Sequence, residues 1–259
     1  MSHDSTQKNV ISQGYTRLLQ VQKRAGETLA ALLLRLRGEY GIPADVPMTY
    51  AGRLDPMAEG LMIVLVGDAC HDKEMYMSRS KTYEFEVLLG VSTDTQDMLG
   101  VVTDTAFGKE VSLEQVQKAI QTLNTKTLWQ YPAYSSRTVN GVPLFVSARK
   151  GSLPTELPTK EGKILSSQIR EIGTVVLSDV VDQKLPIIRL VVGDFRQEEI
   201  IQSWKKMIKE KGNEEVQIIS CIATVTSGVY IRTIASELGK LLGIPALAYS
   251  IERTGIEKI

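Results

Sequence analysis

The chain has 259 residues, 43% hydrophobic and 23% charged, which is the composition of a globular protein long enough for a sizeable core. Its 30 basic and 30 acidic residues cancel, so no global field attracts a polyanion, although a local basic patch still could. Two cysteines and two histidines support neither a disulfide framework nor a multi-histidine metal site. The N-terminus lacks a signal-peptide core and no apolar run is long enough to cross a membrane, so we expect a cytoplasmic protein with no membrane or metal partner.

The first half of the chain predicts short strands and helices in alternation. Apolar residues at helical spacing follow Gly26 and indicate a helix that ends at Gly38 or Gly41. Tyr83 and Phe85 belong to an alternating pattern typical of a half-buried strand. We expect strands over 15–21, 61–66, 81–90 and 101–105, a short helix over 68–77, and a helix that begins with a capping box at 112–115.

The second half predicts a long excursion and then more strands and helices. Residues 131–158 contain four prolines and predict an irregular segment with one short helix around 144–150. We expect strands over 125–130, 167–172, 175–180, 185–192, 216–226 and 246–253, and helices over 197–211 and 231–242. Because the strands are mostly not joined by regular βαβ units, we predict an α+β fold around a mixed, largely antiparallel sheet flanked by helices.

One carboxylate stands out in the loop before the apolar run 61–66. Pro56 keeps Asp55 out of helical conformations, and Gly52 and Gly60 permit tight backbone on either side. A stiff loop beside a buried strand is a common place for a catalytic group. The alternative is a turn aspartate that binds its own backbone, and the loop alone leaves both open.

Charge is concentrated in one stretch. Residues 115–155 contain five basic residues and no acidic one, and four aromatic side chains are interleaved with them. Cations for phosphates and aromatic rings for exposed bases are the ingredients of RNA binding. The alternative is a solvated loop whose aromatic side chains pack against the protein.

Five blocks together identify a family. They are Gly-Arg-Leu-Asp-Pro at 52–56, Lys-Thr-Tyr at 81–83 with Asp-Thr-Gln-Asp at 94–97, Tyr-Ser-Ser-Arg at 134–137, Ser-Gly-Val-Tyr-Ile-Arg at 227–232, and Arg-Thr at 253–254. In this order, and over residues 14–255, the chain resembles the TruB family of RNA pseudouridine synthases. The resemblance implies a cofactor-free isomerase that breaks the glycosidic bond of one uridine, turns the base and rejoins it through carbon.

The resemblance assigns roles to residues that would otherwise be unremarkable. It implies that Asp55 is the catalytic aspartate and that Arg232 pairs with it, as a carboxylate in a closed pocket needs a cation to stay ionised. It implies that Tyr83 stacks on a flipped-out base, and that Tyr230 and Ile251 line the same pocket. Without the family, the last three would be core residues and Arg232 a surface residue in the first turn of a helix.

The resemblance also indicates which residues bind the substrate, although this chain differs from the family pattern at several of these positions. Only Lys23 survives from an Asp-Lys-Pro motif, and Tyr50 replaces a histidine that helps bind the flipped nucleotide, so Tyr50 substitutes by stacking or the grip differs. The excursion 131–158 falls where the family carries its RNA-gripping insertion, with Arg137, Arg149 and Lys150 expected to contact RNA. A lysine expected after Tyr134 is Thr138 here.

We therefore expect a flexible segment 1–13 and one catalytic domain, 14–259, that acts as a monomer. Residues 185–215 are longer than the resemblance requires of the family core. Because the chain stops soon after Gly255, we expect it to lack the C-terminal RNA-binding domain that many members carry. This short form is typical of a stand-alone bacterial enzyme acting on tRNA, at uridine 55 of the T-arm. The alternatives are a pseudouridine synthase for another RNA, such as ribosomal RNA, and a non-catalytic RNA-binding or RNA-folding module.

Overall fold

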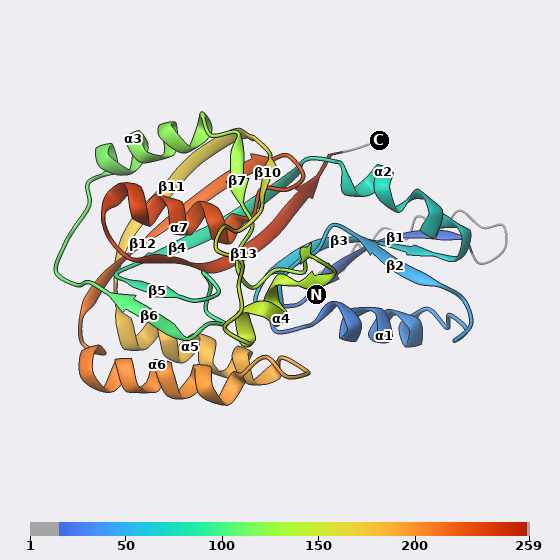
Figure 1. Ribbon diagram of the computed structural model, residues 1–259, viewed down its shortest axis with the longest axis horizontal. Coiled ribbons are helices and arrows are strands. Elements are labelled where there is room, and N and C mark those ends of the chain that lie inside the picture. Colours follow the sequence, from blue (N-terminus) through green and yellow to red (C-terminus); the bar gives the residue numbers. More distant parts are fainter. Residues whose placement is uncertain (1–15, 258–259) are drawn as a thin grey trace, which may run out of the picture.

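A computed structural model describes residues 16–257 of the chain. Its centre is a seven-stranded sheet in the order β1-β3-β13-β4-β12-β11, with β2 also paired to β3 (Figure 1). Only the contact between β13 and β3 is parallel among these neighbours, which confirms the predicted α+β fold with a largely antiparallel sheet. The strands are β1 (Arg17–Lys23), β2 (Met48–Ala51), β3 (Glu59–Val66), β4 (Lys81–Leu89), β11 (Ile164–Val176), β12 (Glu215–Val225) and β13 (Ala246–Ile256).

Helices cover both faces of this sheet. In Figure 1, α3 and α7 lie over one face, α5 and α6 over the other, and α1 lies beside β1, β2 and β3. The helices are α1 (Leu29–Glu39), the 3₁₀ helix η1 (Gly67–Asp72), α2 (Lys73–Met77), α3 (Leu113–Asn124), α4 (Leu144–Arg149), α5 (Leu177–Leu190), α6 (Gln197–Lys211) and α7 (Ile231–Leu242). No helix in the described part of the chain is both long and apolar enough to span a membrane.

Short two-stranded ribbons decorate the main sheet. A hairpin of β5 (Val91–Thr93) and β6 (Val102–Thr105) follows β4, as the sequence predicts for 101–105. The other ribbons pair β7 (Leu128–Gln130) with β10 (Thr159–Glu161), and β8 (Thr138–Val139) with β9 (Val142–Pro143). The β7–β10 ribbon flanks the excursion 131–158, whereas β8, β9 and α4 lie within it; this segment is drawn in yellow-green at the centre of Figure 1.

Alternation along the strands separates the core into two clusters. On β4, Tyr83, Phe85 and Val87 pack with α3 and α7, whereas Leu88 packs with α5 and α6 on the opposite face. Because successive side chains of a strand point to opposite faces, one apolar strand supplies both clusters. The sheet is therefore buried on both sides near its centre.

The region 175–192 differs from its predicted structure. The predicted strands 175–180 and 185–192 are wrong, because α5 is continuous from Leu177 to Leu190 despite Pro186. Its buried residues recur at helical spacing, and they pack against α6 rather than pairing in a sheet. The β-branched residues of this stretch favour a strand locally, but burial against a neighbouring helix overrides that preference. The expected flexible segment 1–13 lies outside the described residues.

A β-bulge in β13 decides which side chains face α7. The pairing with β4 shifts register between Ala248 and Ser250, so Tyr249 has no partner opposite it. As a result Ile251 pairs with Phe85 and lies on the same face as Tyr83, whereas strict alternation from Ala248 would point it to the opposite face. The bulge is what brings Ile251 into the wall of the cleft described below.

Replacing Gly60 with alanine is expected to destabilise the fold strongly. Gly60 has φ 107° where β3 meets β13, and an added Cβ would lie 2.4 Å from the carbonyl oxygen of Arg253. We expect Gly60→Ala to cost about 2 kcal/mol or more in urea unfolding, from left-handed strain and a backbone clash. Gly38→Ala is the control, because Gly38 lies in α1 with open space around it. This control is expected to stabilise the protein by about 0.5–1 kcal/mol, and equal effects of the two changes would contradict the strain assigned to Gly60.

Candidate active site

The loop between β2 and β3 presents Asp55 to a cleft. The main-chain carbonyl of Asp55 accepts from the amide of Ala58 at 3.1 Å, which closes a turn and leaves the carboxylate free to point outward. The Asp55 side chain is 32% exposed. Its carboxylate is bonded by a residue from the far end of the chain, not by its own loop. The geometry therefore differs from that of an ordinary turn aspartate.

The loop rests on a buried ammonium group. Lys23, at the end of β1, donates from Nζ to the carbonyls of Ala58 at 2.5 Å, Arg24 at 3.0 Å and Pro56 at 3.2 Å. Burial lowers the pKa of Lys23 to about 8, against the raising effect of the nearby Asp55 charge. The amide of Gly26 also donates to Pro56, at 2.8 Å. Lys23 thus lies beneath the loop rather than among the residues that line the cleft.

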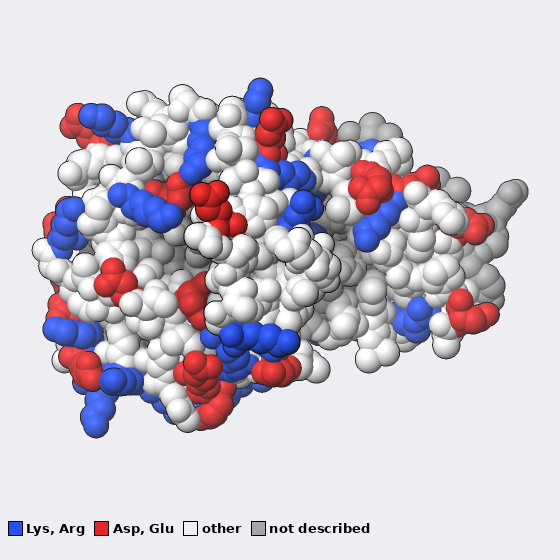
Figure 2. All heavy atoms as spheres, viewed as in Figure 1, with Lys and Arg blue, Asp and Glu red and all other residues white. Residues whose placement is uncertain are grey.

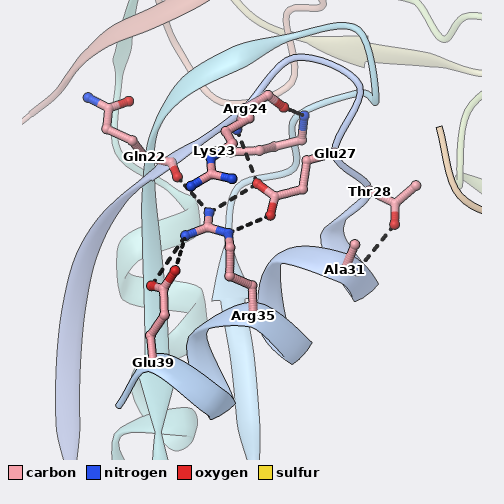
Figure 3. Close-up of polar contacts among 8 residues, drawn as sticks. All are labelled: Gln22, Lys23, Arg24, Glu27, Thr28, Ala31, Arg35 and Glu39. Atoms are coloured by element: carbon pink, nitrogen blue, oxygen red, sulfur yellow. Dashed lines mark hydrogen bonds and ion pairs between the residues drawn. The ribbon is translucent and has the colours of Figure 1, made fainter. Parts of the chain in front are cut away.

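A polar network holds the turn that carries Lys23 (Figure 3). Arg35 of α1 donates to Glu27 at 2.7 Å, to Glu39 at 3.1 Å and to the carbonyl of Gln22 at 3.0 Å. Although burial alone would raise it, the hydrogen bond from Arg35 lowers the pKa of the Glu27 carboxyl, which also accepts from the amide of Arg24. This network supports the turn at the position where the family's Asp-Lys-Pro is replaced.

Arg232 joins the loop to the rest of the site. It lies in the first turn of α7 and is only 2% exposed, so it is not the surface residue that its position alone suggests. Its Nε donates to Asp55 Oδ2 at 2.7 Å, and its two terminal nitrogens donate to the carbonyls of Thr95 at 2.6 Å and Tyr134 at 3.4 Å. Burial acts to lower the pKa of Arg232, but the charges of Asp55 and Asp97 outweigh it and raise that pKa. A rigid guanidinium is well suited to this role, since it binds several acceptors at fixed angles.

Asp97 is a second carboxylate at Arg232 that sequence reasoning did not single out. Its Oδ2 lies 3.6 Å from Arg232 Nε, and its Oδ1 accepts from the Thr95 hydroxyl at 2.7 Å and the Leu99 amide at 2.9 Å. Burial raises the pKa of Asp97 to about 6, partly offset by Arg232. The residue falls in the block 94–97 that helped to identify the family. The sequence showed only an acidic residue in a polar stretch, and nothing in it indicated that Asp97 is buried or that it pairs with Arg232.

Aromatic side chains form the walls of a cleft of about 1030 Å³ above this ion pair. The site brings together every predicted pocket residue except Lys23, as Tyr50, Tyr83, Tyr230 and Ile251 all line the cleft with Asp55 and Arg232. The ring of Tyr230 meets that of Tyr131 edge to face, with centroids 5.7 Å apart. Burial raises the pKa of Tyr230 to about 12, and the Asp55 charge adds to the rise, so this wall stays uncharged at neutral pH.

Tyr50 lies between two cations at the edge of the cleft. Its hydroxyl accepts from Arg53 at 2.7 Å, and Arg53 and Lys73 lie 5.8 Å and 5.6 Å from its ring centroid. An aromatic ring with adjacent cations offers a stacking surface and phosphate partners together. This arrangement is compatible with a stacking role in place of the family's histidine.

The excursion 131–158 supplies part of the same cleft. Arg137 stacks on the ring of Tyr131 at 5.4 Å, and Arg149 pairs with Asp194 at 3.1 Å; both arginines line the cleft. Lys150 is exposed at the end of α4 and is not among the lining residues. Two of the three predicted RNA contacts are therefore gathered at the site.

The cleft is basic although the protein as a whole is neutral. Nine basic and three acidic side chains line it, whereas Figure 2 shows both signs interspersed over the visible face. Such a local excess of positive charge favours a polyanionic ligand without a global field. Within residues 16–257, no three His, Cys, Asp or Glu side chains are placed to hold a metal ion.

Comparison with known proteins identifies the family. The family model described as TruB family pseudouridylate synthase (N terminal domain) matches residues 46–181, which is more than half of the chain. The tRNA pseudouridine synthase B of Oenococcus oeni is 28% identical over 240 residues, covering 92% of this chain and 67% of that protein. The tRNA pseudouridine synthase B of Opitutus terrae is 29% identical over 241 residues, covering 93% and 81%. The chain belongs to the TruB family of pseudouridine synthases.

A solved structure supports the fold assignment. A chain in the crystal structure of a Cbf5-Nop10-Gar1 complex matches with a TM-score of 0.54 at 13% identity, covering 93% of this chain and 49% of that chain. At this identity the likeness concerns the fold alone. The present chain spans about two thirds of the length of the Oenococcus oeni relative.

The ionisation of Asp97 is expected to leave a signature in stability. A carboxyl whose pKa is raised in the folded state costs stability when it ionises, so its contribution falls as pH rises from about 4 to about 6 and then stays constant. We expect the unfolding free energy of the wild type, minus that of Asp97→Asn, to decrease over this interval in urea titrations. A difference that rises or stays constant between these pH values would contradict the assignment.

Proposed function

We propose that this protein is a tRNA pseudouridine synthase whose catalytic residue is Asp55. The substrate is a uridine of folded tRNA, expected to be uridine 55 of the T-arm, which flips into the cleft and is isomerised in place. The observation that carries the proposal is the Asp55–Arg232 ion pair at the floor of a basic, aromatic-walled cleft. The names of the relatives, tRNA pseudouridine synthase B, support tRNA as the substrate class.

The reaction is an isomerisation, so the site has to move a base and a proton without adding any group. The bond from the ribose to nitrogen breaks, a bond from the same ribose to carbon forms, the proton on that carbon leaves and the freed nitrogen takes up a proton. Asp55 is partly exposed in the cleft, and its carboxylate accepts a hydrogen bond from Arg232, so we assign it as the group that engages the uridine. No resident metal or cofactor is part of this scheme.

The cleft walls explain how one base is held while it turns. Tyr83, 8% exposed on β4, is proposed to stack on the flipped base and to take part in the proton transfer. Tyr230 and Ile251 also line the cleft, and Tyr50 is proposed to replace the family's histidine by stacking. A flipped base is ordinarily held in this way, between apolar or aromatic side chains.

Residues outside the reacting centre are proposed to position it. Lys23 supports the Asp55 loop through three carbonyls, so we assign it a positioning role rather than contact with the substrate. Asp97, whose Oδ2 lies 3.6 Å from the same Arg232 Nε that binds Asp55, is proposed to help orient Arg232. We also propose that residues 14–259 act as one catalytic domain and as a monomer, with the excursion 131–158 gripping the RNA.

Mapping pseudouridine after incubation with RNA tests the proposal. Unmodified tRNA transcript and ribosomal RNA fragments are offered separately to the purified protein. Product at a single uridine of the tRNA supports the proposal. Product only in ribosomal RNA would replace tRNA by that substrate, and binding without product in either RNA would favour a non-catalytic RNA-binding module.

Changing Asp55 to asparagine is expected to abolish turnover without loss of RNA binding. The substitution removes the charge at nearly constant shape, and Asp97 still pairs with the buried Arg232, so the fold should persist. Tritium release from uridine-labelled tRNA measures the rate, and filter binding measures affinity. Asp45→Asn, on an exposed loop outside the cleft, is the matched control and should behave as wild type. Near-normal turnover by Asp55→Asn would mean that another residue is catalytic.

Neutralising Arg149 and Lys150 together is expected to weaken RNA binding and its salt dependence. The pair of Arg149 with Asp194 is exposed, so a phosphate can displace it at little cost. We expect the slope of log affinity against log salt to become shallower by about 1 to 2 in Arg149→Gln/Lys150→Gln. Lys205→Gln/Lys206→Gln removes the same charge from the exposed face of α6 and should leave the slope unchanged. An unchanged slope in the first variant would place the RNA grip elsewhere.

A further inference from the structure

Most of the α5–α6 hairpin lies beyond the matched family model. The matched family model ends at residue 181, early in α5, and α6 lies wholly beyond it. The hairpin is nevertheless well anchored on the sheet, because the Tyr249 hydroxyl of β13 donates to the carbonyl of Val180 at 3.1 Å and the fully buried Trp204 packs in the same cluster. Such anchoring makes the tip of the hairpin, residues 191–196, a fixed feature rather than a loose loop.

This tip reaches the active-site cleft. Asp194, Phe195 and Arg196 line the cleft together with Asp55 and Arg232. On one side, α5 approaches the turn beneath the Asp55 loop so closely that a Cβ added at Gly26 would lie 3.1 Å from the carbonyl oxygen of Ile187. On the other side the tip pairs with the excursion through Asp194 and Arg149. The hairpin therefore bridges the two segments that flank the cleft.

Arg196 makes the most specific contacts of this tip. Its guanidinium lies 4.4 Å from the ring centroid of Tyr134 and donates to Asp94 Oδ2 at 2.8 Å. Its backbone has φ 61°, a left-handed conformation that is unfavourable for a residue with a side chain. Strained backbone of this kind persists only where surrounding contacts hold it.

Two short connections lead from these contacts to the proposed catalytic pair. The main-chain carbonyl of Tyr134 accepts from Arg232 at 3.4 Å, so fixing the Tyr134 ring also fixes an acceptor of Arg232. Asp94, the other partner of Arg196, precedes Thr95, whose carbonyl accepts from Arg232 at 2.6 Å. Arg196 thus braces two of the acceptors that orient the guanidinium bonded to Asp55.

We propose that Arg196 is a positioning residue for pseudouridine formation, acting through Tyr134 and Asp94 on the Arg232–Asp55 pair. This inference rests on the proposed function of Asp55. It makes the α5–α6 hairpin part of the active site of this chain, as a brace that joins the excursion to the catalytic floor. The guanidinium contacts the Tyr134 ring and donates to Asp94 at the same time, so a lysine at this position would keep the charge and lose the brace.

The test compares Arg196→Ala and Arg196→Lys with wild type in single-turnover tRNA conversion at saturating enzyme. Both variants are expected to lose roughly ten- to hundredfold in rate, because small misplacements of a catalytic group carry costs of this size. The lysine variant should keep near-normal RNA affinity and the same thermal unfolding midpoint. Arg189→Ala removes an exposed arginine of the same hairpin, away from the cleft, and should match wild type in every measurement.

A measurement independent of activity separates this inference from the proposed function. The NMR signal of the Arg232 Nε–H, which is bonded to Asp55, should shift and exchange faster with solvent in both Arg196 variants and not in Arg189→Ala. Normal rate and an unchanged Arg232 signal in Arg196→Lys would overturn the proposal and leave Arg196 as a simple charge. A wild type without activity on any RNA would instead refute the proposed function, while the NMR comparison still decides the positioning role.

Discussion

A buried guanidinium is the constraint on which the site depends. Arg232 is almost fully buried, and an isolated charge in that environment would be very costly, so its neighbours must supply acceptors. They do so from three separate segments, through Asp55, through Thr95 and Asp97, and through Tyr134. Satisfying one side chain therefore ties the β2–β3 loop, the turn after β5 and the excursion to the start of α7.

The segments around this ion pair are themselves held in place by charged side chains. Lys23 is buried below the Asp55 loop, and its ammonium group donates to main-chain carbonyls. The ion pair of Arg35 with Glu27 in turn holds the turn next to Lys23. From the tip of the α5–α6 hairpin, Arg196 likewise holds Asp94 through a hydrogen bond and Tyr134 through contact with its ring. The position of the Asp55 carboxylate is thus fixed by these surrounding contacts. The pair of Arg149 with Asp194, by contrast, is exposed, and such pairs contribute little stability.

Local patterns predicted much of the fold and the central part of the site. The alternation at Tyr83 and Phe85, the capping box at 112–115 and the predicted helix 231–242 are all present in the structure. These features are encoded within a few residues, by side-chain period or by turn chemistry. Around α5, by contrast, β-branched residues suggested strands, and packing against α6 decided for a helix.

The sequence by itself determined the family, the carboxylate loop and its arginine, because short motifs carry the residue types that the chemistry needs. Only the tertiary structure decided which groups meet. A bulge at Tyr249 turns Ile251 toward Tyr83, Asp97 joins Arg232 from a polar turn, and the tip of the α5–α6 hairpin brings Arg196 onto Tyr134. No periodic pattern in the sequence predicts these contacts, because each joins segments that are far apart along the chain. They depend on strand register, on burial and on the need to neutralise a buried charge.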